Sequence, residues 1–70
     1  MLRLKLWRLQ QNLTQAEAAR AIGIGESSYA ILESGRLRPT TGQQERLRTY
    51  FGDIVDSLFD PVRDRIEVAR

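Results

Sequence analysis

The chain has 70 residues and a net charge of +2, which is enough for one small domain near the lower size limit for an unaided hydrophobic core. It contains no cysteine and no histidine, so disulfides, zinc–thiolate sites and the usual proton shuttle are excluded, and we expect no enzyme activity, no cofactor and no metal site. No apolar run approaches the roughly 20 residues that span a bilayer, and charges interrupt the N-terminal leucines, so we expect a soluble, cytoplasmic protein.

The charge is distributed unevenly along the chain. Residues 1–50 contain eight Lys and Arg against four Asp and Glu, a balance of +4, whereas residues 51–70 contain three against five, a balance of −2. A polyanion would therefore meet the N-terminal part first. Solvation of a small domain's surface explains the same charges equally well, so charge alone supports nucleic-acid binding only weakly.

The leucine-rich N-terminal segment fits a helix better than a strand. Leu2, Leu6 and Leu9 recur at helical spacing, and Leu4 with Trp7 forms a neighbouring stripe. Leu2, Leu4 and Leu6 also alternate with charges as in a strand, but the segment consists of good helix formers without a β-branched residue. Together the stripes are wider than one core needs. We therefore expect Trp7 in the core, and some of Leu2, Leu6 or Leu9 exposed or in contact with another chain.

A second helix is predicted between a polar cap and a glycine. Thr14, followed three residues later by Glu17, is a capping box, in which the hydroxyl and the carboxylate satisfy each other's free backbone donors. Gly23 ends this helix, because glycine adopts the left-handed conformation most easily. The inner face is predicted to consist of two alanines and Ile22.

A third helix is predicted from about Glu26 to Leu32, and it stops at Ser34-Gly35. Small residues between it and the preceding helix allow the two to cross closely at a steep angle. This is the helix-turn-helix arrangement, which lays its second helix in the major groove of DNA. Within it, Tyr29 is expected to be a core residue whose hydroxyl reaches the rim.

A fourth helix is predicted after the loop at residues 36–39. Pro39 disfavours helix at the residue before it, and Thr40 with Gln43 forms a second capping box. The helix should run from about Thr41 to Phe51. Its inward-facing residues are predicted to be Leu47, Tyr50 and Phe51.

The C-terminal part divides into a fifth helix and a tail. Asp53 can cap a helix over residues 54–59. Its apolar residues are Ile54, Val55 and Leu58. Three structures are open for the tail, residues 60–70. Asp60-Pro61 suits the start of a sixth helix, and the alternation of apolar and charged residues suits an edge strand. A frayed, solvated terminus fits as well. We therefore divide the chain into a domain of residues 1–59 and a tail that is a candidate dimerisation element.

An ordered set of residues matches one known pattern from about residue 4 to residue 59. The set is Arg8, Leu13-Thr14-Gln15, Ala19, Gly23, Glu33-Ser34-Gly35, Pro39-Thr40, Leu47, Phe51-Gly52 and Leu58-Phe59. With it, the chain resembles the Cro/repressor-type helix-turn-helix family, also called XRE-like regulators. The resemblance implies an all-α, five-helix, lambda-repressor-like bundle that binds double-stranded DNA as a homodimer. It also implies a repressor of transcription associated with the nucleoid.

The resemblance further implies roles for single residues. Arg8 and Glu33 match an internal ion pair that ties the first helix to the third. Contacts to DNA phosphates are implied for Thr14, Gln15, Ser34, Arg36 and Arg38. Contacts to base edges are implied for Gly25, Glu26, Ser27, Ser28, Ala30 and Ile31.

The implied base-reading face has an atypical composition. It carries no arginine, glutamine or asparagine, the side chains that make bidentate contacts to guanine or adenine. Glu26 can accept from cytosine but repels phosphates, while Ala30 and Ile31 can touch a thymine methyl. Two functions therefore stay open. One is a DNA-binding regulator with modest sequence discrimination, and the other is a protein-interaction or antitoxin-like module whose partner contacts the same face.

Overall fold

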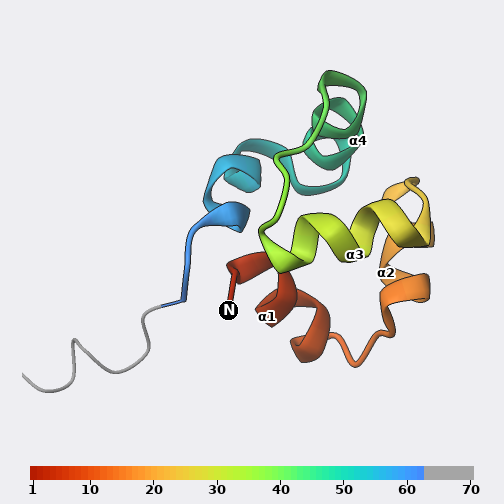
Figure 1. Cartoon of the computed structure of the whole chain (residues 1–70), viewed down its shortest axis with the longest axis vertical. Coiled ribbons are helices and arrows are strands. Elements are labelled where there is room, and N and C mark those ends of the chain that lie inside the picture. The colour runs from red at the N-terminus through yellow and green to blue at the C-terminus, as the bar shows by residue number, and fades with distance from the viewer. Residues whose placement is uncertain (63–70) are drawn as a thin grey trace, which may run out of the picture.

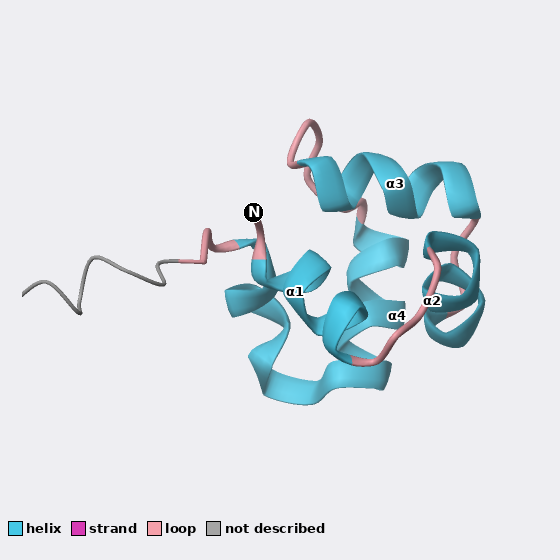
Figure 2. Ribbon diagram, turned by 90° about the horizontal axis from the view of Figure 1, so that it is seen from below, coloured by secondary structure: helices cyan, strands magenta, loops and turns pink. Residues whose placement is uncertain are grey.

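The structure is a computed structural model that describes residues 1–62 of the chain. Its elements are α1 (Arg3–Gln10), α2 (Gln15–Ile22), α3 (Glu26–Ser34), α4 (Thr41–Phe51) and a 3₁₀-helix, η1 (Gly52–Phe59) (Figure 1). The all-helical class is confirmed, because the described residues form helices and loops without a β-strand (Figure 2). The part of the predicted tail at 63–70 lies outside the described residues. Within the described range, no helix has the length and apolar character that crossing a membrane requires.

The helices α2 and α4 begin at the two capping boxes that the sequence predicts. Glu17 N donates to Thr14 Oγ1 at 3.1 Å, and Thr14 N donates to Glu17 Oε1 at 2.8 Å. Thr40 and Gln43 make the same pair of bonds at the start of α4, at 3.2 and 3.0 Å. Each box satisfies backbone donors that the first turn of a helix leaves free, so these helix starts are set by local sequence.

The hydrophobic core lies where all five elements meet. Leu4 of α1, Tyr29 of α3 and Leu47 of α4 are fully buried at its centre. The buried hydrophobic residues among positions 1–62 are Leu4, Ala18, Ala19, Ile22, Tyr29, Leu32, Leu47, Val55 and Leu58. Leu9, by contrast, is exposed on α1, as expected from a leucine pattern that is wider than one core needs.

An aromatic cluster closes one side of this core. The ring of Trp7 contacts Phe51 edge-on, with centroids 4.9 Å apart, and Tyr50 completes the cluster at 5.7 Å from Trp7. Trp7 and Phe51 are half-buried against the core. Tyr50 was predicted to face inward, but 47% of it is exposed, because its ring only covers the edge of the other two.

The fifth helical segment is a 3₁₀-helix, whereas an α-helix was expected in an all-α bundle. The backbone leaves the α conformation at Gly52, where φ is +77° and ψ is −145°. A turn of three residues places positions i and i+3 on one line, and Val55 and Leu58, which have this spacing, are both buried. Ile54, the third apolar residue of this segment, lies off that line and is exposed.

The start of the chain pairs with the residues that follow η1. Leu2 and Pro61 form an isolated antiparallel bridge. Arg3 N donates to Asp60 O at 3.0 Å, and Val62 N donates to Met1 O at 2.7 Å. Within residues 60–62 the chain forms this bridge and is not helical, and the alternatives predicted for the rest of the tail lie outside the described residues. This pairing holds the described part of the tail against the beginning of α1.

Candidate nucleic-acid interface

The turn between α2 and α3 depends on a glycine in the left-handed conformation. Gly23 has a φ of +97°, and its N–H donates to Ala19 O at 2.8 Å. A Cβ at this position would also meet the Arg46 guanidinium at 3.1 Å. The buried faces of Ala18 and Ala19 let α2 and α3 approach closely. The turn therefore fixes the angle at which α3 leaves α2.

The helix α3 has a buried face and an exposed face. Tyr29, Leu32 and Glu33 are buried against the rest of the molecule. The six residues implied to contact bases lie elsewhere on its surface: Gly25, Glu26, Ser27 and Ile31 are exposed, and Ser28 and Ala30 are half-buried. In Figure 2, α3 forms one edge of the molecule, with the loop after it curving at its end. The structure thus brings these residues together on one accessible surface.

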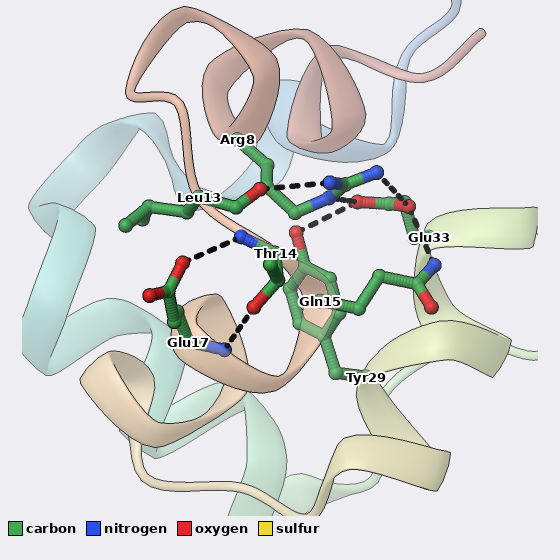
Figure 3. A network of polar contacts seen from close by, with 7 residues as sticks. All are labelled: Arg8, Leu13, Thr14, Gln15, Glu17, Tyr29 and Glu33. Carbon is green, nitrogen blue, oxygen red and sulfur yellow. Dashed lines mark hydrogen bonds and ion pairs between the residues drawn. The ribbon is translucent and has the colours of Figure 1, made fainter.

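Behind this face, the buried carboxylate of Glu33 accepts four hydrogen bonds (Figure 3). Arg8 Nε donates to Oε2 at 2.7 Å, and Arg8 Nη2 donates to Oε1 at 3.1 Å. Tyr29 OH donates to Oε2 at 2.9 Å, and Gln15 Nε2 donates to Oε1 at 2.9 Å. Arg8 also donates to Leu13 O at 2.9 Å. We call Arg8, Gln15, Tyr29 and Glu33 the Glu33 network; it joins α1, α2 and α3.

The network keeps Glu33 ionised and Tyr29 neutral. Burial alone raises the pKa of Glu33, but the hydrogen bonds from Arg8, Gln15 and Tyr29 outweigh it and lower the pKa below its ordinary value. Burial and the hydrogen bond to Glu33 raise the pKa of Tyr29. The hydrogen bond to Glu33 also raises the pKa of Arg8, against the effect of burial. The ion pair is therefore fully charged at neutral pH.

Sequence reasoning missed two members of this network. It paired Arg8 with Glu33, whose side chains lie 2.7 Å apart, but it placed the Tyr29 hydroxyl at the rim. Instead, Tyr29 is fully buried and its hydroxyl donates inward to Glu33. The spacing of four residues along α3 is the signal that points to this contact. Gln15 was assigned only to a phosphate, and its bond to Glu33 has no signal in the sequence.

The residues implied to contact phosphates come from two segments that meet near the end of α3, where Gln15 is bonded to Glu33. Thr14 and Gln15 are at the start of α2, where Thr14 is exposed and Gln15 is half-buried. Ser34, Arg36 and Arg38 are exposed at the end of α3 and in the loop after it. The first group supplies amide donors and the second supplies cationic donors, so one side of the molecule near the end of α3 offers both kinds to a phosphate backbone.

The hydroxyl of Ser34 is used within the chain. Ser34 Oγ donates to Ile31 O at 2.6 Å and accepts from Arg36 N at 3.2 Å. The bond from Arg36 holds the first residues of the loop close to the end of α3. Ser34 therefore shapes the loop that carries the two arginines, a role that the sequence analysis did not assign to it.

One family model, described as a helix-turn-helix domain, matches residues 2–52 of the chain. The matched range includes α1 to α4 and all four residues of the Glu33 network. No curated protein and no solved structure matches the chain in the corresponding comparisons.

Proposed function

The chain belongs to the helix-turn-helix domain family, and from this we propose that it is a DNA-binding transcriptional regulator. In this proposal α3 enters the major groove of double-stranded DNA, while the start of α2 and the loop after α3 contact phosphates. The observation that carries it is the exposed face of α3, which is backed by the buried Glu33 network.

The Glu33 network supports this proposal because it holds α3 in one orientation. Glu33 is bonded to Arg8 of α1 and to Gln15 of α2, so the end of α3 is tied to both preceding helices. A reading helix that is fixed before binding loses less conformational freedom when it enters the groove. The network thus gives rigidity to a surface whose own side chains are short.

The phosphate contacts follow from charge and helix geometry. Arg36 and Arg38 are exposed and carry positive charge beside the end of α3. Gln15 lies in the first turn of α2, where free backbone amides and the helix dipole favour an anion. Its Nε2 already donates one hydrogen to Glu33, which holds the amide in place and leaves its other hydrogen for a phosphate oxygen.

We further propose that the protein acts as a homodimer and as a repressor of transcription, as the resemblance implies. Two copies would place their α3 helices in successive major grooves, about 34 Å apart. A single small domain buries little surface on DNA, so dimerisation raises affinity. The exposed Leu9 and the tail after residue 60 are the proposed interface, and occupancy of an operator on the nucleoid is the proposed repressing step.

One observation favours a second function, that of a protein-interaction or antitoxin-like module. The exposed face of α3 lacks the side chains that make bidentate base contacts, and it displays Ile31. In such a module this face would contact a protein partner, and the duplex affinity would be weak or lost.

A salt titration on a mixed-sequence duplex distinguishes these functions. For a DNA binder, the affinity falls steeply with added salt, and Arg36→Ala or Arg38→Ala each reduces the slope by about one unit. Arg36→Lys is the control, since it keeps the charge and therefore the slope. Absence of duplex binding at low salt by a folded protein contradicts the proposed function and favours the protein-interaction module.

A further inference from the structure

A small hollow with an apolar side lies beside the exposed face of α3, where the following loop passes close to it. It is lined by Ser28, Ile31 and Leu32 of α3, by Leu37, Arg38 and Thr40 before α4, and by Gln43 of α4. Ile31 is 36% exposed and Leu37 is 63% exposed, so both apolar side chains are accessible from outside. We call this feature the Ile31–Leu37 hollow.

Local geometry explains why Leu37 reaches α3. Gly35 ends the helix in the left-handed conformation, with a φ of +82°, and so turns the chain sharply. The bond from Arg36 N to Ser34 Oγ then holds the loop near the helix end. Ser28 and Ile31 lie three positions apart and thus share the side of α3 that faces this loop. The hollow is a consequence of the turn at the end of α3.

The size and charge of the hollow restrict its occupant. Its volume is about 100 Å³, well below the range of about 300–1,000 Å³ that is usual for small-molecule sites. Arg36 and Arg38 are exposed at or beside it, and exposed guanidinium groups suit the phosphates of a polyanion. A small apolar group on a polyanion fits both properties better than a protein side chain on an apolar surface.

Only one base presents an apolar group in the major groove, namely thymine with its C5 methyl. We infer that the Ile31–Leu37 hollow receives a thymine methyl group, while Arg36 and Arg38 contact the adjacent phosphates. This inference rests on the proposed function, since it requires α3 to lie in the groove. Such a contact makes the protein prefer A·T pairs at the contacted position. This sequence discrimination needs no side chain that makes bidentate contacts to a base.

Duplexes of alternating d(AT) and d(AU), long enough for two successive major grooves, test this inference. They differ only in the C5 methyl groups, so their affinities at one salt concentration compare the same protein with and without the methyl. We expect the native protein to bind d(AT) more tightly, by about fourfold for each contacted methyl, the equivalent of about 0.8 kcal/mol. Ile31→Ala and Leu37→Ala should each reduce this ratio towards one.

Ile54→Ala is the matched control, because Ile54 is an exposed apolar residue of η1 and should leave the ratio unchanged. Circular dichroism melting shows that each variant is folded. Equal binding of d(AT) and d(AU) by the native protein overturns the inference. An unchanged preference for d(AT) in both Ile31→Ala and Leu37→Ala overturns it as well. Binding of neither duplex contradicts the proposed function itself. Without DNA, the sedimentation coefficients of the native protein and of Ile31→Ala are also compared. A difference between them would show that the hollow contacts a second copy of the chain, and this too would overturn the inference.

Discussion

At the scale of single residues, the fold depends on one buried carboxylate. Glu33 is only 6% exposed, yet its two oxygens accept four hydrogen bonds from three side chains. A buried charge is costly unless it is paired and hydrogen-bonded, and here both conditions are met. Among the described residues, no buried side-chain nitrogen or oxygen lacks a partner. Removing any one member of the network should therefore cost more free energy of unfolding than the intact network contributes.

We predict that Glu33→Gln destabilises the protein by about 3 kcal/mol, because it leaves the partly buried Arg8 without its counter-ion. Tyr29→Phe removes one hydrogen bond to a charged group and should cost about 1.5 kcal/mol. Urea denaturation measures both values. Tyr50→Phe is the control, since Tyr50 is largely exposed and should have no effect. Equal costs for the two tyrosine variants would contradict the role given to the Tyr29 hydroxyl.

The network also predicts a dependence of stability on pH. The pKa of Glu33 is lower in the folded state than its ordinary value of 4.5, so the unfolded state binds its proton first. The stabilisation is therefore complete above about pH 4.5 and is lost as the pH falls through the folded pKa. Urea midpoints between pH 3 and 6, compared with those of Glu33→Gln, measure the effect. A midpoint for the native protein that falls no more steeply with acid than that of the variant would contradict it.

At the scale of elements, local signals set some boundaries and packing sets others. The start of α4 at Thr41 follows from the adjacent capping box, which involves residues only three positions apart. The 3₁₀ form of η1 and the exposure of Ile54 depend on which side chains the rest of the core covers, and a sequence pattern does not contain that information. The network shows the same limit: the resemblance implied the Arg8–Glu33 pair, but the Gln15 contact joins side chains 18 positions apart.

Two glycines offer a direct test of the element boundaries. Gly23→Ala should destabilise the protein by about 1–2 kcal/mol, because its φ is +97° and an added Cβ meets Arg46. Gly42→Ala, within α4, should instead stabilise it by about 0.5–1 kcal/mol, because nothing lies within 4 Å and alanine favours the helix. Thermal or urea unfolding compares the two. Effects of the same sign would contradict the assigned turn.

At the scale of the whole molecule, the described residues leave apolar surface outside the core. Leu9, near the end of α1, is 44% exposed. Met1, which takes part in the pairing of the chain start with residues 60–62, is also exposed. The exposed face of α3 continues along the chain into the cationic loop at residues 36–38, whereas this N-terminal surface comes from the start of the sequence. The proposed homodimer assigns the first two to DNA and the third to a second copy of the chain.

We predict that the sedimentation coefficient of the native protein rises with concentration, and that Leu9→Ser shifts this transition to higher concentration by removing buried apolar area. Ile54→Ser is the control, because Ile54 is comparably exposed but belongs to η1. A sedimentation coefficient that stays monomeric at every concentration rules out the proposed dimer.

The central claim, that the exposed face of α3 contacts DNA, is tested most directly by amide chemical shifts during titration with a duplex. We predict changes at the start of α2, along residues 25–31 and in the loop at residues 36–38. The amides of η1 should remain near their starting positions, because η1 packs on the other elements and contributes no proposed contact. Changes confined to α4 and η1, or no changes at a duplex concentration that saturates a typical regulator, would contradict the account.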